Sequence, residues 1–189
     1  MLMVMIQTME QGAADERERL DRLLTRVAAG EQEALGELYH RTRSAVYALA
    51  LSILKNAHDA QDVTQDTFVR VWDSAPQYRA QGSPMAWILT IARNLARMKL
   101  RQGTRQVELD EEQWEAIPAD APGITPEDRH LLQEALSVLN DEERRVVLLH
   151  AVSGLKHREI AALLELSLAA VLSKYHRALK KLKVFMERR

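Results

Sequence analysis

Two Glu-x-x-His pairs have the residue types and the spacing that carboxylate-bridged di-iron bundles use. They are Glu37 with His40 and Glu127 with His130, each on an expected helix. A di-iron site also needs two further inward-facing glutamates, yet these pairs fall in different expected domains and on the polar sides of their helices. The sequence also lacks a Gly-rich phosphate loop, a His-Glu-x-x-His motif and a Gly-x-Ser-x-Gly elbow. We therefore expect no catalytic residue, no metal, no cofactor and no enzymatic reaction.

A stripe of carboxylates is the next candidate for chemistry, in the segment HDAQDVTQDTFVRVW. Asp59, Asp62 and Asp66 recur at i, i+3 and i+7, which places them on one helical face opposite much of the apolar set. Such a face can dock a protein, hold a metal ion or simply be solvated. The spacing alone leaves these three interpretations open.

The following segment, SPMAWILTIARNLARMKLRQ, is basic. Residues 83–105 contain no acid and five cations, namely Arg93, Arg97, Lys99, Arg101 and Arg105. An exposed face of this kind attracts phosphates. Trp87 either stacks on an unpaired base or packs among Ile88, Ile91 and Ala92 as a core residue.

A helix-turn-helix pattern lies near the carboxyl end, in HREIAALLELSLAAVLSKYHRALKKLK, with a short turn at residues 165–167. Its second helix can enter a major groove, where side chains near its start read base edges and flanking cations neutralise phosphates. The alternative is that basic groups in the last turns only solvate the helix and offset its dipole. The exposed polar or basic groups expected there are Ser173, Lys174, His176, Arg177, Lys180, Lys181 and Lys183.

The elements that position these residues are expected to be helices, because the 7 glycines and 5 prolines lie between long stretches of helix-forming residues. The first bundle comprises helices near 15–29, 32–54, 58–75 and 83–102. A second domain comprises helices near 126–139, 141–153, 156–165 and 168–187. Ser83, Asn140 and Ser167 are the expected caps. Residues 106–128 hold eight acids and no Lys or Arg, which indicates a linker.

The composition indicates a folded protein of the cytoplasm. Hydrophobic residues make up 47% and charged residues 28%, which suits a buried core with a solvated surface. The net charge of -1 argues against a uniformly basic nucleic-acid binder, and the absence of cysteine excludes disulfides and thiolate metal sites. The longest apolar run, residues 45–54, is about half the roughly 20 residues that a membrane-spanning helix needs. We therefore expect no membrane insertion.

These segments together resemble a known family. The run from Leu38 to Gln102, above all DAQDVTQDTFVRVW followed by AWILTIARNLARMKLR, resembles region 2 of the extracytoplasmic-function (ECF) group of the sigma-70 family of bacterial RNA polymerase sigma factors. The run from Leu139 to Leu182 resembles region 4. The resemblance implies an all-α fold of two small helical domains: region 2 at 15–105 and region 4 at 126–189, joined by an acidic linker at 106–125. Residues 1–14 are an extension without a counterpart, for which disorder is one interpretation.

The resemblance also implies a function and a set of contact residues. The chain would bind core RNA polymerase and direct promoter-specific transcription initiation. The helix with the carboxylates would dock on the clamp helices of the largest subunit, through Asp59, Asp62, Gln65, Asp66 and Arg70. The loop at 76–83 and the basic helix would recognise and melt the minus-ten element, through Tyr78, Arg79, Trp87, Arg93, Asn94, Arg97 and Arg101.

Region 4 would read the minus-thirty-five element and touch the flexible flap of the second large subunit. The matching recognition-helix residues are Ser173, Lys174, His176 and Arg177. An anti-sigma partner is expected to cover both DNA-facing surfaces. The linker either threads the polymerase near the template strand, as in similar proteins, or is a flexible tether with solubilising charge.

The sequence departs from the family at several positions and leaves two other functions open. Met98 stands where an aspartate is usual. Relatives often have Gly, Pro, Gly-Thr and Lys or Arg where this chain has Glu165, Ser167, Ala169-Ala170 and Leu172, so a cation is missing from a groove-facing position. One alternative is a dimeric helix-turn-helix regulator that binds DNA without polymerase. The other is a sigma mimic that titrates an anti-sigma protein through protein contacts alone.

Overall fold

The computed structural model describes residues 2–80, 82–102 and 134–188, with only the helix given for residues 2–13. Every regular element in these ranges is a helix, which confirms the all-α prediction. Among these helices none is both long and apolar enough to cross a membrane. The acidic linker and the Glu127–His130 pair lie outside the described residues.

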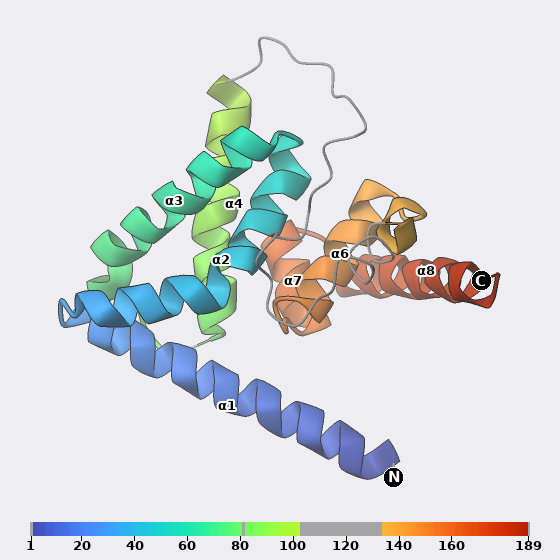
Figure 1. Ribbon diagram of the computed structural model, residues 1–189, viewed down its shortest axis with the longest axis horizontal. Coiled ribbons are helices and arrows are strands. Elements are labelled where there is room, and N and C mark those ends of the chain that lie inside the picture. The colour runs from blue at the N-terminus through green and yellow to red at the C-terminus, as the bar shows by residue number, and fades with distance from the viewer. Residues whose placement is uncertain (1, 81, 103–133, 189) are drawn as a thin grey trace.

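The first group of helices forms the bundle that the sequence predicts (Figure 1). Its elements are α1 (Leu2–Ala28), α2 (Gln32–Leu54), α3 (Ala57–Ser74), the 3-10 turn η1 (Ala75–Gln77) and α4 (Pro84–Gln102). The bounds of α2 are those expected from the sequence, whereas α1 begins well before the expected start near residue 15. Gly30, at φ +87, allows the reversal from α1 into α2. The Ala86 amide donates to the Ser83 hydroxyl at 3.3 Å, so Ser83 caps α4 as expected.

The core of this bundle comes from the apolar stripes of the four helices. Leu24 of α1, Leu38 and Val46 of α2, and Ile88 and Leu89 of α4 are fully buried. Burying each such side chain contributes about 1.5–3 kcal/mol relative to leaving it exposed. In α2 the apolar residues recur at spacings of three and four residues, which gathers Leu38, Val46 and Leu49 on one buried face.

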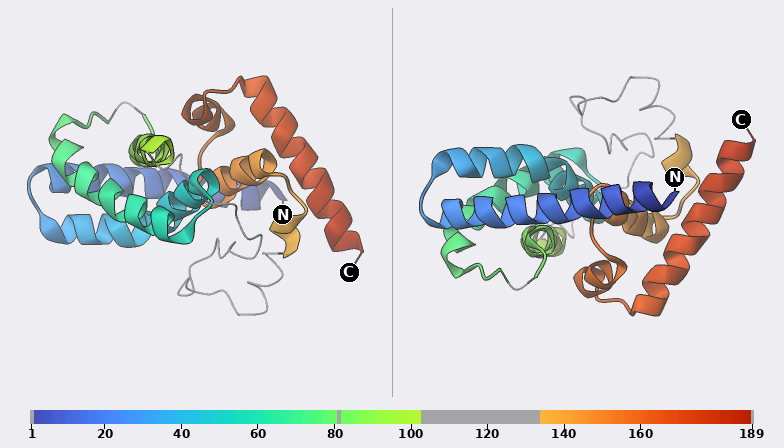
Figure 2. Two further views of the ribbon diagram at one scale, coloured as in Figure 1. Left: turned by 90° about the horizontal axis from the view of Figure 1, so that it is seen from above. Right: turned by 90° about the horizontal axis from the view of Figure 1, so that it is seen from below.

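The second group consists of α6 (Asp141–Ala151), α7 (His157–Leu164) and α8 (Leu168–Glu187). Asn140 opens α6 with a capping box, in which its Oδ1 accepts from the Glu143 amide at 2.9 Å. Ser167 caps α8 by accepting from the Ala170 amide at 3.1 Å. Both caps were predicted; Asn140 sets where α6 begins, and Ser167 sets where α8 begins after α7. The long α8 runs along the outside of the molecule in both views of Figure 2.

The two groups pack directly against each other, which the sequence did not predict. Val146, Leu149 and Ile160 of the second group belong to the same buried cluster as Leu24 and Ile88 of the first. The contacts run between α2 and α6 and between α4 and α7. The chain therefore has two helical domains, as expected, but in this structure they are closed on one another.

Candidate protein and nucleic-acid interfaces

Two of the three carboxylates that the sequence aligned on α3, Asp59 and Asp62, are already paired within the bundle. The Lys99 ammonium of α4 lies 3.0 Å from the Asp59 carboxylate and 2.8 Å from that of Asp62. The hydrogen bond from Lys99 holds the pKa of Asp62 below its usual value, against the opposing effect of burial. Lys99 is thus turned toward α3, so it does not add to the positive face that the sequence indicated for α4.

The remaining part of α3 presents a mixed acidic and apolar surface. Gln65, Asp66 and Arg70 are exposed, as expected. Val69 is 63% exposed, and Asp66 makes no ion pair with any described residue. We call this surface the docking face; its members are Asp62, Gln65, Asp66, Val69, Arg70 and Asp73. Val69 and Asp73 were missed, although extending the helical spacing from Asp62 through Asp66 reaches both.

The outer side of α4 carries four exposed residues at i, i+4, i+7 and i+11, which we call the basic stripe: Thr90, Asn94, Arg97 and Arg101. Three of them were predicted to contact the minus-ten element. Thr90 was not; its hydroxyl donates to the Ala86 carbonyl at 2.7 Å. The stripe joins two guanidinium groups with two small polar groups on one surface, as phosphate and base contacts require.

Tyr78 and Trp87 form a supporting pair beneath the loop before α4. Their ring centroids are 5.0 Å apart, and the Tyr78 hydroxyl donates to the Asp21 carboxylate of α1. Burial and this hydrogen bond raise the pKa of Tyr78. Both rings are half-buried against the core, while Arg79 beside them is exposed. Arg17 of α1 also donates to the Gly82 carbonyl at 2.5 Å, so α1 holds the loop at two points.

Replacing Tyr78 with phenylalanine is expected to lower the free energy of unfolding by about 1 kcal/mol, because the Asp21 carboxylate loses its partner while the ring is kept. Urea unfolding followed by tryptophan fluorescence measures the change. Tyr39→Phe is the matched control, since the Tyr39 hydroxyl makes no hydrogen bond with a described residue and its ring packs on Phe68. Equal stability of the two variants would contradict the support assigned to Tyr78.

Arg93, the first of the predicted minus-ten arginines on α4, points away from the basic stripe and toward α7. Its guanidinium donates to the Leu163 carbonyl and lies 3.0 Å from the Glu165 carboxylate, and its side chain is only 14% exposed. Arg97 reaches the other oxygen of Glu165 at 3.0 Å. Arg97 and Arg93 hold the pKa of Glu165 below its usual value. In this conformation both arginines are therefore occupied by the second domain.

The predicted recognition residues on α8 divide into two sets. Ser173 and His176 are exposed and share a face with Ala169 and Lys180, which together we call the reading stripe. The other two pair with acids of α6: Lys174 lies 2.6 Å from Glu142, and Arg177 lies 3.5 Å from Glu143. A helix lying in a major groove would thus present Ser173 and His176 most directly. Lys180, which was expected as an exposed basic group but not as a recognition residue, adds a further cation.

A pair of stacked imidazoles packs against α8. The ring centroids of His150 and His157 are 4.6 Å apart, and Tyr175 of α8 meets both rings edge-on. Burial lowers the pKa of His157, and the neighbouring His150 and His176 lower it further. Its buried Nε2 has no hydrogen-bond partner in the described chain. The folded state therefore favours neutral His157.

Stability is expected to fall as the pH drops below about 6.5, the ordinary histidine pKa, because the unfolded chain then binds a proton that folded His157 resists. Above that pH no stability is lost in this way, because His157 is neutral in both the folded and the unfolded chain. Thermal unfolding at a series of pH values should show Tm falling by a few degrees more in the wild type than in His157→Phe. His58→Gln is the control, because the His58 side chain is 83% exposed. An identical pH profile for wild type and His157→Phe would refute the assignment.

Glu37, one half of a candidate di-iron pair, is engaged in ion pairs. Its carboxylate lies 2.6 Å from Arg19 and 3.1 Å from Arg41, and both arginines lower its pKa. Over the ranges that the structure covers, no cluster of three or more His, Asp or Glu side chains could hold a metal ion. Glu37 thus joins α1 to α2 and has a structural role.

Comparison with known proteins identifies the two groups of helices. The family model described as Sigma-70 region 2 matches residues 38–106, and the model described as Sigma-70, region 4 matches residues 129–182. The chain is 32% identical over 171 residues to the ECF RNA polymerase sigma factor SigK of Mycobacterium tuberculosis (strain H37Rv), covering 87% of this chain and 91% of the relative. The chain belongs to the ECF sigma factors. It is also 29% identical over 184 residues to SigK of Mycobacterium ulcerans, covering 91% of this chain and 96% of that protein.

Solved structures place this sigma factor in the same fold. CnrH, solved in complex with the cytosolic domain of CnrY, is 28% identical with a TM-score of 0.57, covering 89% of this chain and 98% of that one. The sigma factor RpoE of Bartonella quintana was solved with the anti-sigma factor NepR. It is 20% identical with a TM-score of 0.53, covering 80% of this chain and 96% of that one. At this identity the likeness shows the fold alone. The region 2 match covers α3, α4 and most of α2, and the region 4 match covers α6, α7 and α8 up to residue 182. A sigma factor serves transcription initiation with RNA polymerase.

Proposed function

We propose that this sigma factor binds core RNA polymerase through the docking face of α3 and binds promoter DNA through α4 and α8. The observation that carries the proposal is the placement of two unlike surfaces on neighbouring helices of one bundle. The docking face combines carboxylates with exposed Val69, the mixture expected of a protein interface. The basic stripe has no acid of its own and suits a nucleic-acid backbone.

The two DNA contacts differ in kind. The basic stripe lies beside the half-buried Tyr78–Trp87 pair and the exposed Arg79, so a strand of the minus-ten element held there would meet cations and aromatic rings. The reading stripe of α8 is suited to the major groove of the minus-thirty-five element, with Ser173 and His176 near the base edges and Lys180 near a phosphate. Both contacts act by binding alone, and the protein catalyses no reaction.

The proposal places the protein in the cytoplasm, where polymerase and promoters are found. An anti-sigma protein is a further proposed partner. It is supported by CnrH, a structural neighbour at 28% identity that was solved in complex with the cytosolic domain of a second protein, CnrY.

Reconstitution with core RNA polymerase on a library of promoter sequences tests the function. Transcripts that require both this protein and core polymerase are the expected result. Sequence-specific DNA binding by the protein alone, without added transcription, would instead indicate a regulator that acts without polymerase. Neither activity, combined with binding to an anti-sigma protein, would indicate a sigma mimic.

A further inference from the structure

The turn that ends α7 places a glutamate in a backbone conformation that glycine adopts more readily. Glu165 has φ 58 and ψ 41, in the left-handed region. A residue with a side chain is strained there, whereas glycine is not. The Glu165 side chain points across the domain boundary to α4, so its position is set by contacts outside its own helix.

The Glu165 carboxylate bridges two arginines of α4. One oxygen lies 3.0 Å from Arg93 and the other lies 3.0 Å from Arg97. Arg93 also donates to the Leu163 carbonyl at the end of α7. Arginines bind a phosphate group in the same arrangement, in which two guanidinium groups share one anion and each contacts a different oxygen.

We propose that Arg93 and Arg97 form a phosphodiester-binding site and that Glu165 occupies this site in the closed chain as an internal substitute for phosphate. Separation of the domains removes Glu165 and exposes the site to the backbone of a DNA strand. This inference rests on the proposed function in taking α4 as a DNA-facing helix. It adds that the ligand is a backbone phosphate and that Glu165 competes with this phosphate for the arginine pair.

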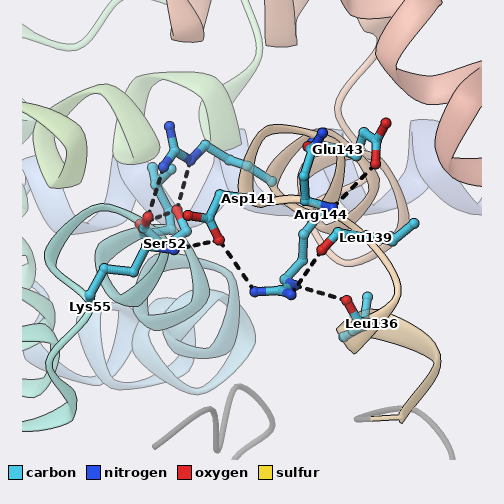
Figure 3. Close-up of polar contacts among 10 residues, drawn as sticks. Ser52, Lys55, Leu136, Leu139, Asp141, Glu143 and Arg144 are labelled. Atoms are coloured by element: carbon cyan, nitrogen blue, oxygen red, sulfur yellow. Dashed lines mark hydrogen bonds and ion pairs between the residues drawn. The ribbon is translucent and has the colours of Figure 1, made fainter. Parts of the chain in front are cut away.

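A second contact closes the domains at a distance from this site. Arg145 of α6 donates to the Ser52 hydroxyl at 3.0 Å and to the Ser52 carbonyl at 2.7 Å, at the end of α2. Figure 3 shows Lys55, the residue that follows α2, reaching Asp141 of α6. The Lys55 ammonium lies 2.5 Å from the Asp141 carboxylate. Because this contact does not involve the arginine pair, polar groups join the domains at two separate places, in addition to the apolar cluster that the domains share. Removing Glu165 therefore loosens the closed state while the α2–α6 contact stays intact.

The Glu165 contact is weak enough for DNA to replace it. The side chains of Glu165 and Arg97 are 56% and 50% exposed, so solvent and salt screen their attraction. A DNA strand offers many phosphates in place of one carboxylate, and its binding also releases counterions. The buried Arg93 gains its exposure to DNA only when α7 leaves. The closed chain should therefore bind DNA weakly and the open chain more tightly.

The test uses the full chain and a generic single-stranded DNA oligonucleotide. Glu165→Gln removes the charge but keeps the side-chain size and the strain of the left-handed backbone. Glu165→Gly removes the whole side chain and also relieves that strain. Both variants are expected to bind the oligonucleotide about 3- to 10-fold more tightly than the wild type in fluorescence anisotropy. Glu18→Gln is the matched control for net charge, because the exposed Glu18 pairs only with the neighbouring Arg22 among the described residues. This control should leave the affinity within about 2-fold of the wild type.

Domain opening is measured in the same proteins. The sequence has no cysteine, so dyes can be attached specifically at Glu33→Cys on α2 and Ala162→Cys on α7, both exposed positions. Energy transfer between the dyes should fall in Glu165→Gln, and adding Arg97→Gln to that variant should abolish the gain in DNA affinity. Circular dichroism verifies that each variant keeps its helices.

Two results would overturn the inference. One is unchanged energy transfer and affinity in Glu165→Gln. The other is a gain in Glu165→Gly alone, which would assign the effect to backbone strain. If Glu165→Gln opens the chain and binds DNA more tightly, yet the wild type fails to support polymerase-dependent initiation, the proposed function fails while the masked phosphate site stands.

Discussion

Association with core RNA polymerase is expected to weaken by about 100-fold when Asp66 is replaced with arginine. Asp66 lies in the docking face, is exposed, and makes no ion pair with any described residue, so its full charge is available to a partner. Charge reversal removes this attraction and replaces it with repulsion of any partner cation that would pair with Asp66. Equilibrium binding of labelled protein to core polymerase, at fixed salt concentration, measures the effect.

Asp59→Asn provides the matched comparison on the same helix. The Asp59 carboxylate already lies 3.0 Å from the Lys99 ammonium, so its charge is partly neutralised before any partner arrives. We expect this change to weaken polymerase binding by less than about 3-fold. A loss as large as that of Asp66→Arg would show that the whole acidic stripe docks. Undiminished binding by Asp66→Arg would remove α3 from the polymerase interface.

Features that depend on neighbours along the chain were predictable from the sequence. The bounds of α2 were predicted, and Asn140 and Ser167 were identified as caps from their residue types. Helical periodicity alone aligned Asp62 with Asp66. In each case the determining contacts lie within about four residues, where residue type and spacing carry the information.

Features that depend on distant contacts were not predictable in this way. Lys99 was counted with the cations of α4, but packing of α4 beside α3 turns it to Asp59 and Asp62. Glu165 was noted as a departure from the family, and only the closed arrangement of the domains shows its two arginine partners. Such pairs join residues that are far apart in the sequence, and no local pattern encodes them.

Replacing Glu143 with alanine is expected to lower the free energy of unfolding of the second domain by about 2 to 3 kcal/mol. Its side chain is only 2% exposed and accepts from the Asn140 amide at 3.2 Å as part of the capping box. It also accepts from the Lys181 ammonium of α8 at 2.7 Å. Although burial raises the pKa of Glu143, the bonds from Lys181 and the Asn140 amide outweigh it, so the pKa is lowered overall.

The pH dependence of the unfolding free energy separates the contribution of the buried Glu143 charge from that of the helix cap. Because the folded pKa of Glu143 is depressed, its contribution is present above the ordinary glutamate pKa of about 4.3 and is lost as the pH falls through the folded value. Glu143→Ala should therefore show its full deficit in urea unfolding at neutral pH and a smaller one in acid. Glu142→Ala, which removes only the exposed partner of Lys174, should lose less than about 1 kcal/mol. Equal losses in the two variants would mean that α8 is held by surface charge, and the orientation of the reading stripe would then depend on salt.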